Sequence, residues 1–316
     1  MQEAENFIYK SYKKNDEYKI VNLFQKVFKK KFDITKWKWI FKKNPNGRNI
    51  ISLVLSKKKL IAQCASIKIN FIFNNKKRNF YRIQNFMVHK NYRIKKIATK
   101  SLKFLTSKIV KNNNYIITFP NNNSIKTFLK NGFKRIFYVY TYEFSLNKKY
   151  KIKKKIDVKN SIFIKFKYED VKFMNECLKN YDIFNLRAKN YLNWRYSINY
   201  DNYKISRIYL NKRIIGLVIA KFYKIDKSIC ICEMFYKKET NNSLQLLIDS
   251  TVSNFKKNKP RIIKIWSMTH FYFHKDLLRY GFKKNTFKTN VCTYKNLSKN
   301  KGIRNMYLSM GDSDVY

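Results

Sequence analysis

The stretch "VHKNYRIKKIATKSL", residues 88–102, decides what this chain folds into. It follows an apolar run at 86–88 that is typical of the end of a strand, and its second half has the spacing of an amphipathic helix. The apolar positions of that helix are Ile97, Leu102, Leu105 and Ile109. Arg93, Lys95 and Lys96 stand where the strand passes into the helix. Because the first N–H groups of a helix lack intrahelical partners and lie at its positive end, this basic turn predicts a site for an anion such as phosphate.

The composition sets the frame for this site. With 316 residues the chain is long enough for two domains, and 45 % hydrophobic residues exclude an intrinsically disordered chain. The 70 Lys and Arg residues against 19 Asp and Glu give a formal charge of +51, which is one reason to consider a nucleic-acid binder. The lysines are spread over the whole chain, however, and Phe and Tyr are abundant while Gly and Pro number six and three. We therefore attribute most of the charge to a genome rich in A and T, and expect only weak, non-specific adhesion to RNA.

The five cysteines contain no CxxC pair, so the sequence indicates neither a disulfide framework nor a zinc site. His270 and His274 could share a helix face, but no third ligand has a recognisable spacing, and we expect no metal. The acidic start "MQEAENF" predicts no signal peptide, and no apolar run approaches the roughly 20 residues of a membrane span. These features together predict a cytoplasmic protein.

The sequence also repeats itself. The repeat consists of two pairs of segments, 38–65 with 193–220 and 128–135 with 277–284. In the first pair Trp39 falls on Trp194, and in the second pair "KNGF" falls on "RYGF", with the glycine where a helix commonly ends. The offsets are 155 residues (193 − 38) and 149 residues (277 − 128), as a duplicated domain with small insertions would give.

The pattern therefore predicts a first domain over 1–146, a basic linker over 147–160, a second domain over 161–300 and a tail over 301–316. In the first half it predicts helices at 17–30, 35–43, 96–110 and 122–131 and strands at 50–56, 60–73, 78–88, 115–119 and 134–145. In the second half it predicts helices near 168–180, 188–197, 241–257 and 271–280 with strands between them.

Two motifs give the chain a resemblance to the GNAT N-acetyltransferase superfamily, in a tandem two-domain form with a degenerate second domain. The family's acyl-CoA motif is a strand ending V-x-P-x-Y-R, followed by Q/R-x-x-G-x-G/A at a helix start. This chain has "VHKNYR" at 88–93 and then "IKKIA" at 94–98. The family's later element, N-x-x-A-x-x-x-Y-x-K-x-G-F, is similar to "NNNSIKTFLKNGF" at 121–133. The resemblance implies two α/β (α+β) domains, each with a mixed twisted sheet flanked by helices.

The resemblance also implies that acyl-CoA binds the first domain, with its pyrophosphate on backbone N–H groups of the basic turn. The residues that it assigns to the cofactor are Val88, Arg93, Ile94, Lys95, Lys96, Ile97, Ala98, Asn121 and Phe128. Lys96 departs from the family, which prefers glycine there. Either its backbone takes the positive φ that glycine tolerates, at a cost of about 1 kcal/mol, or it is helical and its ammonium replaces a lost N–H contact.

The catalytic groups are less clear. The resemblance places the oxyanion donor on a backbone N–H near a bulge at the end of the strand, which we assign to Met87. Gln84 stands where many members carry a carboxylate base, and could orient substrate or water. Glu233, on the corresponding strand of the second half, is a second candidate base. The alternative interpretation is that it pairs with a lysine. Phe128 replaces the tyrosine that protonates the thiolate, so this role is vacant or moved. His89 we interpret as a structural or CoA contact rather than a base.

We therefore expect an enzyme that moves an acetyl or other short acyl group from acyl-CoA to a primary amine of a small molecule, such as an amino sugar, with acetyl-CoA as cosubstrate. One alternative is a tandem aminoacyl transferase that uses charged tRNA and a cell-wall precursor, which would account for the charge but would not need an acyl-CoA loop. Another is a non-enzymatic RNA-binding protein, which a single basic face lined with aromatic residues would favour. The sequence does not predict an oligomeric state.

Overall fold

The computed structural model describes residues 6–93, 96–146, 150, 159–161, 165–196, 202–237, 242–294, 297 and 301–313. The chain divides into two units. The first contains Met1–Phe71, Lys76–Tyr138 and Asn290–Ile303, and the second contains Ile72–Asn75, Val139–Thr289 and Arg304–Tyr316. The units are therefore built from interleaved segments of the chain. The linker predicted at 147–160 lies almost entirely outside the described residues.

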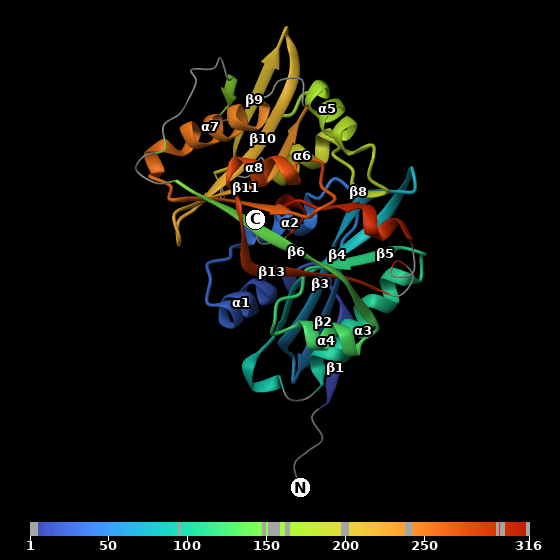
Figure 1. Cartoon of the computed structure of the whole chain (residues 1–316). Helices are drawn as coiled ribbons and strands as arrows, with labels where there is room; N and C mark the ends of the chain where they lie inside the picture. Colours follow the sequence, from blue (N-terminus) through green and yellow to red (C-terminus); the bar gives the residue numbers. More distant parts are fainter. Residues whose placement is uncertain are drawn as a thin grey trace. The chain divides into compact units, whose positions relative to one another are not determined.

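The first unit is a mixed sheet with helices on both sides (Figure 1). Its elements are β1 (Phe7–Ser11), α1 (Asp16–Phe28), α2 (Ile34–Lys42), β2 (Ile50–Ser56), β3 (Lys59–Phe73), β4 (Lys76–Val88), the 3-10 turn η1 (Lys90–Tyr92), α3 (Ile97–Val110), β5 (Tyr115–Thr118), α4 (Ile125–Lys130) and the first part of β6 (Phe133–Ser145). The strand order is β1-β2-β3-β4-β5-β13-β6, where β13 (Lys283–Tyr294) contributes its last residues from the far end of the chain. Strands β4 and β5 are parallel, and β1, β2 and β3 are antiparallel neighbours.

Alternation along the strands gives this sheet two distinct faces. Tyr81 and Ile83 of β4 pack against Leu102 and Leu105 of α3 in a buried apolar cluster. Because successive strand residues point to opposite faces, the residues between them point away from α3. Figure 1 shows α1 on the side of the strands opposite α3. The apolar spacing that predicted the helix after residue 96 therefore describes the contact face of α3.

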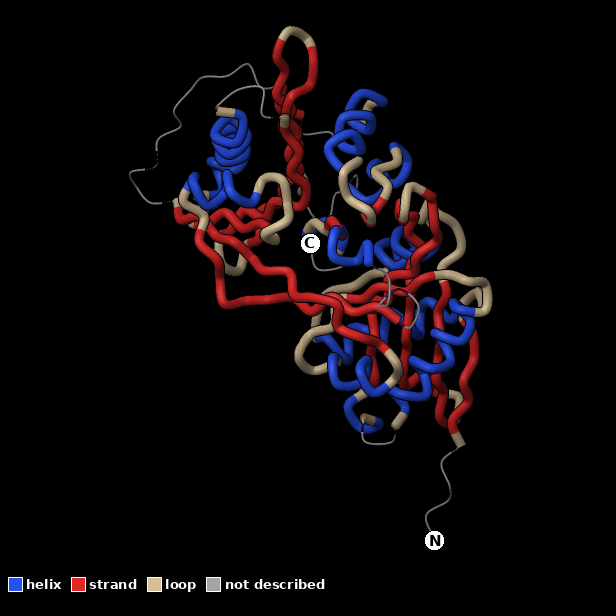
Figure 2. The backbone as a smooth tube through the Cα atoms, turned by 45° about the vertical axis from the view of Figure 1, so that its right-hand side comes forward, coloured by secondary structure: helices blue, strands red, loops and turns tan. Residues whose placement is uncertain are grey.

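The second unit repeats this order. Its elements are β7 (Lys159–Ser161), α5 (Tyr168–Leu178), β8 (Ile183–Asn185), α6 (Lys189–Tyr196), β9 (Lys204–Leu210), β10 (Arg213–Tyr223), β11 (Ser228–Tyr236), α7 (Ser243–Phe255), η2 (Lys256–Asn258), β12 (Ile262–Ser267), α8 (His274–Tyr280), η4 (Lys301–Asn305), β14 (Met306–Tyr307) and η5 (Met310–Asp312), with parts of β6 and β13. Strands β7-β9-β10-β11-β12-β6 are neighbours in that order, and β11 and β12 are parallel, as β4 and β5 are (Figure 2). Thus β11 corresponds to β4, β12 to β5, α5 to α1 and α7 to α3.

The turns of the repeat agree in detail. Lys57 and Lys58 join β2 to β3 with φ of 45° and 65°, and Asn211 and Lys212 join β9 to β10 with φ of 48° and 63°. Two successive left-handed residues are the mark of a type I′ hairpin, whose twist suits antiparallel strands. The gapless alignment of 38–65 with 193–220 therefore corresponds to one structural unit that occurs twice.

The predicted fold class is confirmed, and the predicted helices and strands agree with the structure within a few residues at each end. The sequence pattern did not predict β1, β14 or β7, the last of which begins within the predicted linker. It also gave no indication that residues 306–313, predicted as part of a tail, are buried in the second unit.

Candidate active site

Strands β4 and β5 separate part-way along their length. Their pairing runs from Phe80 opposite Tyr115 to Ile83 opposite Thr118, where β5 ends, while β4 continues to Val88. Just beyond the last pair, Asn85 takes a left-handed φ of 50° within β4. The backbone of β4 is therefore irregular where it leaves its partner, and backbone groups over 84–88 face a gap in the sheet.

The described part of the turn after β4, residues 89–93, stays close to the end of the strand. The His89 N–H donates to the Ile61 carbonyl at 2.8 Å, which holds the end of β4 on β3. The Arg93 Nε donates to the Val88 carbonyl at 3.4 Å, so this side chain folds back onto the strand end. Two of the predicted cofactor residues, Ile94 and Lys95, lie outside the described residues.

The backbone of Lys96 decides between the two conformations, left-handed or helical, that the sequence left open. It has φ 54° and ψ 13°, in the left-handed region, and it precedes the first residue of α3 without a side-chain hydrogen bond to cap the helix. The first intrahelical bond runs from the Lys100 N–H to the Lys96 carbonyl, so the N–H groups of the first turn, at Ile97 and Ala98, have no acceptor within the helix. Lys96 thus adopts the strained conformation that glycine would take freely, and donor groups remain at the start of α3.

We expect Lys96→Gly to raise the free energy of unfolding by about 1 kcal/mol, because it removes a left-handed Cβ. Lys100→Gly, four residues on in the interior of the same helix, is the matched control and should lower stability by about 1 kcal/mol. Chemical denaturation measures both. Equal losses in the two variants would show that Lys96 is not left-handed in solution.

The face of β4 that points away from α3 carries a buried polar cluster. Arg82 Nη2 donates to Gln84 Oε1 at 2.9 Å, and both side chains are buried. Gln63 of β3 lies on the same face, since its neighbours at 62 and 64 pack on the α3 side, and its Nε2 donates to the Asn85 carbonyl at 3.2 Å. The Gln63 Oε1, with the residue 0 % exposed, and the Asn85 Nδ2 are buried without hydrogen-bond partners. An unpaired buried amide costs about 1–3 kcal/mol, so this cluster is the candidate polar site on the face of β4 that points away from α3.

Residues 15–133 match the acetyltransferase (GNAT) family. These residues are a GNAT domain. The match begins just before α1 and ends at the first residue of β6, so it takes in the strand gap, the turn and α3.

Solved structures agree with this domain in fold. A GCN5-related N-acetyltransferase from Anabaena variabilis aligns with a TM-score of 0.69 at 10 % identity, covering 91 % of this chain and 72 % of that chain. A probable N-acyltransferase from Enterococcus faecalis gives 0.68 at 12 % identity, with 91 % and 72 % covered. N-myristoyltransferase from Saccharomyces cerevisiae, solved with bound myristoyl-CoA and inhibitors, gives 0.62 at 13 % identity, with 93 % and 81 % covered. No curated protein sequence matches the chain. At these identities the likeness is one of fold, and it extends over both units.

In the GNAT domain, Asn121 follows β5 on the other side of the gap. It is exposed, and its Oδ1 accepts hydrogen bonds from the Ser124 N–H at 3.1 Å and the Ser124 hydroxyl at 3.0 Å. Its carbonyl accepts from the Ile125 N–H at the start of α4. Asn121 therefore shapes the turn into α4 through its two oxygens, and these bonds do not use its amide N–H groups.

Phe128 of the GNAT domain lies in the core. Its ring is 2 % exposed and packs edge-on against Phe86 and Phe133, with centroids 5.5 and 5.0 Å away. A side chain in this position contributes apolar packing behind β4 rather than a proton at the reacting centre.

We accordingly expect Phe128→Tyr to lower the free energy of unfolding by about 1–3 kcal/mol, because its hydroxyl would be buried without a partner. Thermal denaturation measures this. A variant that is as stable as the parent and has a higher kcat would show that the hydroxyl reaches the gap, and would return Phe128 to the position of the missing acid.

The second unit has the corresponding gap, and its own chain fills it. Strands β11 and β12 pair as far as Ile231 and Ile265, and a register shift in β11 follows at Cys232. Residues 306–313 pack here: a Cβ added to Gly311 would lie 2.0 Å from the Tyr196 hydroxyl and 3.2 Å from the Cys232 carbonyl. Beside β11, residues of the chain itself therefore occupy the place where the strand has left its partner.

Glu233, the predicted second base, is part of this closure. Its Oε2 accepts from Arg187 Nη2 at 2.9 Å, and Arg187 Nη2 also donates to Asp312 Oδ2 at 3.1 Å; all three residues are buried. The Tyr196 hydroxyl donates to Glu233 Oε1 at 2.8 Å. Burial raises the pKa of Glu233, against the opposing effect of Arg187. This carboxylate does form an ion pair, but its partner is a buried arginine rather than a lysine.

The described residues contain neither a candidate metal centre nor a candidate membrane span. No group of three or more His, Cys, Asp and Glu side chains among them could hold a metal ion. None of their helices is long and apolar enough to cross a membrane.

Proposed function

We propose that this protein is an acyl-CoA-dependent N-acyltransferase whose GNAT domain binds the donor in the gap beside β4, with acetyl-CoA as the donor of first choice. The family supports acyl transfer as the general chemistry. The observation that carries the proposal is the combination of an irregular β4 beside a gap with the uncapped start of α3 at its end. The first can take a thioester, and the second a pyrophosphate.

The donor is held from both sides of the gap. N–H groups at Ile97 and Ala98, with Arg93 at the strand end, bind its phosphates, and Asn121 donates to its arm. The Met87 backbone N–H stabilises the charge that develops on the thioester oxygen. Val88 packs with Ile97 in one apolar cluster and so sets the distance between strand end and helix start.

Transfer proceeds by direct attack. The neutral amine of the acceptor attacks the thioester carbon, the C–S bond breaks and an amide forms, while the amine's proton passes to solvent. A thiolate with a pKa of about 8.5 leaves without an acid, so the absence of a hydroxyl at Phe128 is tolerable. Gln84 Oε1, which already accepts from Arg82 Nη2, has a second lone pair that accepts a hydrogen bond from the incoming N–H group and orients the nitrogen, while the buried Gln63 holds the Asn85 backbone beside it.

Among the buried carboxylates, Glu17 of α1 is the nearest in sequence to Gln84, and it is unsuited to act as base. Burial alone would raise its pKa, but hydrogen bonds from backbone N–H groups and from the Tyr12 hydroxyl hold the pKa below its ordinary value. The acceptor therefore enters as the free amine, and the rate follows the fraction of amine that is neutral.

Release of free CoA thiol with a panel of primary amines, amino sugars first, tests the proposal. We expect release that depends on the acceptor and that falls at least tenfold in Gln84→Ala and Gln63→Leu, mainly in kcat/KM. Gln245→Ala, in the second unit, is the matched control and should leave the rate unchanged. Tight acetyl-CoA binding without acceptor-dependent release from any amine would contradict an amine acyltransferase.

A further inference from the structure

Each unit has a pocket beside its first helix, and the two pockets occupy equivalent positions. The helices align through their N-terminal aspartates: Asp16 Oδ2 accepts from the Lys13 N–H and Asp170 Oδ2 from the Lys167 N–H, both at 2.8 Å. The offset is 154 residues (170 − 16). It places the lining residues Asn22, Leu23 and Lys26 on the lining residues Glu176, Cys177 and Asn180. His89 and Lys237, each the first residue after the long parallel strand, line the two pockets as well.

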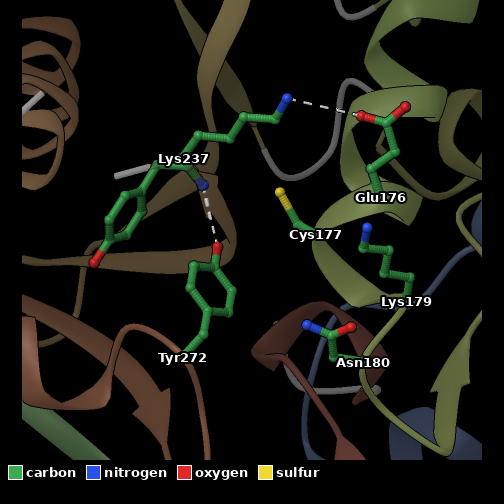
Figure 3. A pocket seen from close by; sticks show the side chains of 7 residues that line it. Glu176, Cys177, Lys179, Asn180, Lys237 and Tyr272 are labelled. Atoms are coloured by element: carbon green, nitrogen blue, oxygen red, sulfur yellow. Dashed lines mark hydrogen bonds and ion pairs between the residues drawn. The ribbon is translucent and has the colours of Figure 1, made fainter. Parts of the chain in front are cut away.

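The pocket of the second unit is of mixed character (Figure 3). It has a volume of about 300 Å³ and is lined by Tyr236 and Tyr272 as well as by charged groups of both signs. Lys237 Nζ faces Glu176 Oε2 at 4.0 Å, and the Tyr272 hydroxyl accepts from the Tyr236 N–H at 3.1 Å. The polar groups of this pocket are therefore largely paired with one another.

The pocket of the first unit differs in charge. It has a volume of about 270 Å³, and its lining contains no carboxylate. Its lining residues are Lys19, Asn22, Leu23, Lys26, Lys58, Lys59, Leu60 and His89. Within the described residues, no ion pair joins any of the four lysines to an acid. Four unpaired ammonium groups from α1 and from the β2–β3 turn thus converge on one hollow.

The pKa of His89 responds to the positive charge around this pocket. The His89 Nδ1 is buried without a hydrogen-bond partner. Burial, with the charges of Lys59, Lys26, Lys90 and Arg93, holds the pKa of His89 below its ordinary value. The ring is therefore neutral at pH 7 in the free protein, and an anion in the pocket would raise its pKa by offsetting the lysines.

We infer that this pocket, here called the α1 pocket, binds an anionic group, phosphate or carboxylate, carried by the acceptor amine. That the ligand is the acceptor rests on the proposed function, whereas its negative charge is inferred from the lining of the pocket. The α1 pocket is bordered by α1, on the side of the strands where Gln63 and Gln84 point, rather than by α3, where the donor's phosphates bind. His89 is two residues beyond Met87, the proposed oxyanion donor, or roughly 7 Å along the strand, so the acceptor carries its anion about that far from the amine.

Inorganic phosphate is the first probe. The chain has three histidines, so the ring signals of His89 can be followed by NMR in the whole protein. We expect a saturable shift and a raised His89 pKa on addition of phosphate, with affinity at least tenfold lower in Lys26→Glu and in Lys59→Glu. Lys275→Glu, an exposed lysine of α8, is the matched control for the change in charge. A shift that does not saturate, or that weakens equally in the control, would refute an anion site.

A second arm identifies the source of the anion. The phosphate titration is repeated with acetyl-CoA at saturation, and acetyl-CoA binding is measured separately by calorimetry. Unchanged phosphate affinity supports the acceptor, whereas competition between the two would assign the α1 pocket to a phosphate of the donor and overturn the inference. Neither arm needs turnover, so the anion site can fail while the acyltransferase stands, and the reverse.

Discussion

Replacing Arg187 by Met lowers the free energy of unfolding by about 3–5 kcal/mol, the usual cost of leaving buried charges without their partner. Arg187 is 0 % exposed and bonds to Glu233, Asp312 and the Ser309 hydroxyl at 2.9–3.1 Å. Without the guanidinium, two carboxylates would face each other in a dry interior. Chemical denaturation of the full chain measures the loss.

Two variants separate this explanation from lost packing. Arg213→Met, the same exchange at the exposed first residue of β10, should change stability by less than about 0.5 kcal/mol. The triple variant Arg187→Met, Glu233→Gln, Asp312→Asn removes all three charges and should recover much of the loss, since a buried ion cluster can be replaced at little cost. If Arg187→Met alone costs less than 1 kcal/mol, residues 306–313 are not anchored by this cluster.

Reversing the charge of Arg93 weakens acetyl-CoA binding by tenfold to a hundredfold, or about 1.4–2.8 kcal/mol. A hydrogen bond to a charged group contributes about 1.5–3 kcal/mol, and Arg93→Glu also puts a carboxylate near the pyrophosphate. Arg78→Glu, at the exposed opposite end of β4, makes the same change in charge away from the site and should cost less than threefold. Unchanged affinity in a folded Arg93→Glu protein would mean that the phosphates bind elsewhere.

The sequence predicted the local units well because their signals are local. The Trp-containing helix, the two strands after it and the tight basic turn between them lie within 28 residues, and the copy at 193–220 repeats them. The helix after Lys96 was visible from apolar spacing alone. The left-handed backbone at Lys96 was one of two open alternatives, because a single residue type does not fix φ.

The parts that the sequence did not predict depend on contacts between distant residues. Arg187 meets Asp312 across 125 positions, and β13 joins the sheet of the first unit between β5 and β6. No periodicity marks either event. The α1 pocket was hidden for another reason: its lysines are indistinguishable in sequence from the many others of a chain with +51 charge, and only their convergence on His89 separates them.

The difference between local signals and contacts of distant residues also explains which catalytic candidates the sequence indicated. Glu233 stood out as an acid in an apolar strand, and the structure gives it a buried partner. Gln63 did not stand out, because an amide in a strand carries no motif; its signal is the unpaired oxygen that appears only once β3 and β4 are side by side.

Calorimetric titration of the full chain with acetyl-CoA at physiological salt tests the central claim most directly. The account predicts one site per chain, because β4 leaves β5 near the uncapped start of α3, whereas residues 306–313 occupy the corresponding place beside β11. That site should weaken in Arg93→Glu and be unaffected by Arg213→Met. Two equivalent sites would contradict the closure of the second unit. No acetyl-CoA binding, with tight and selective binding of tRNA under the same conditions, would contradict the account as a whole and favour the aminoacyl transferase.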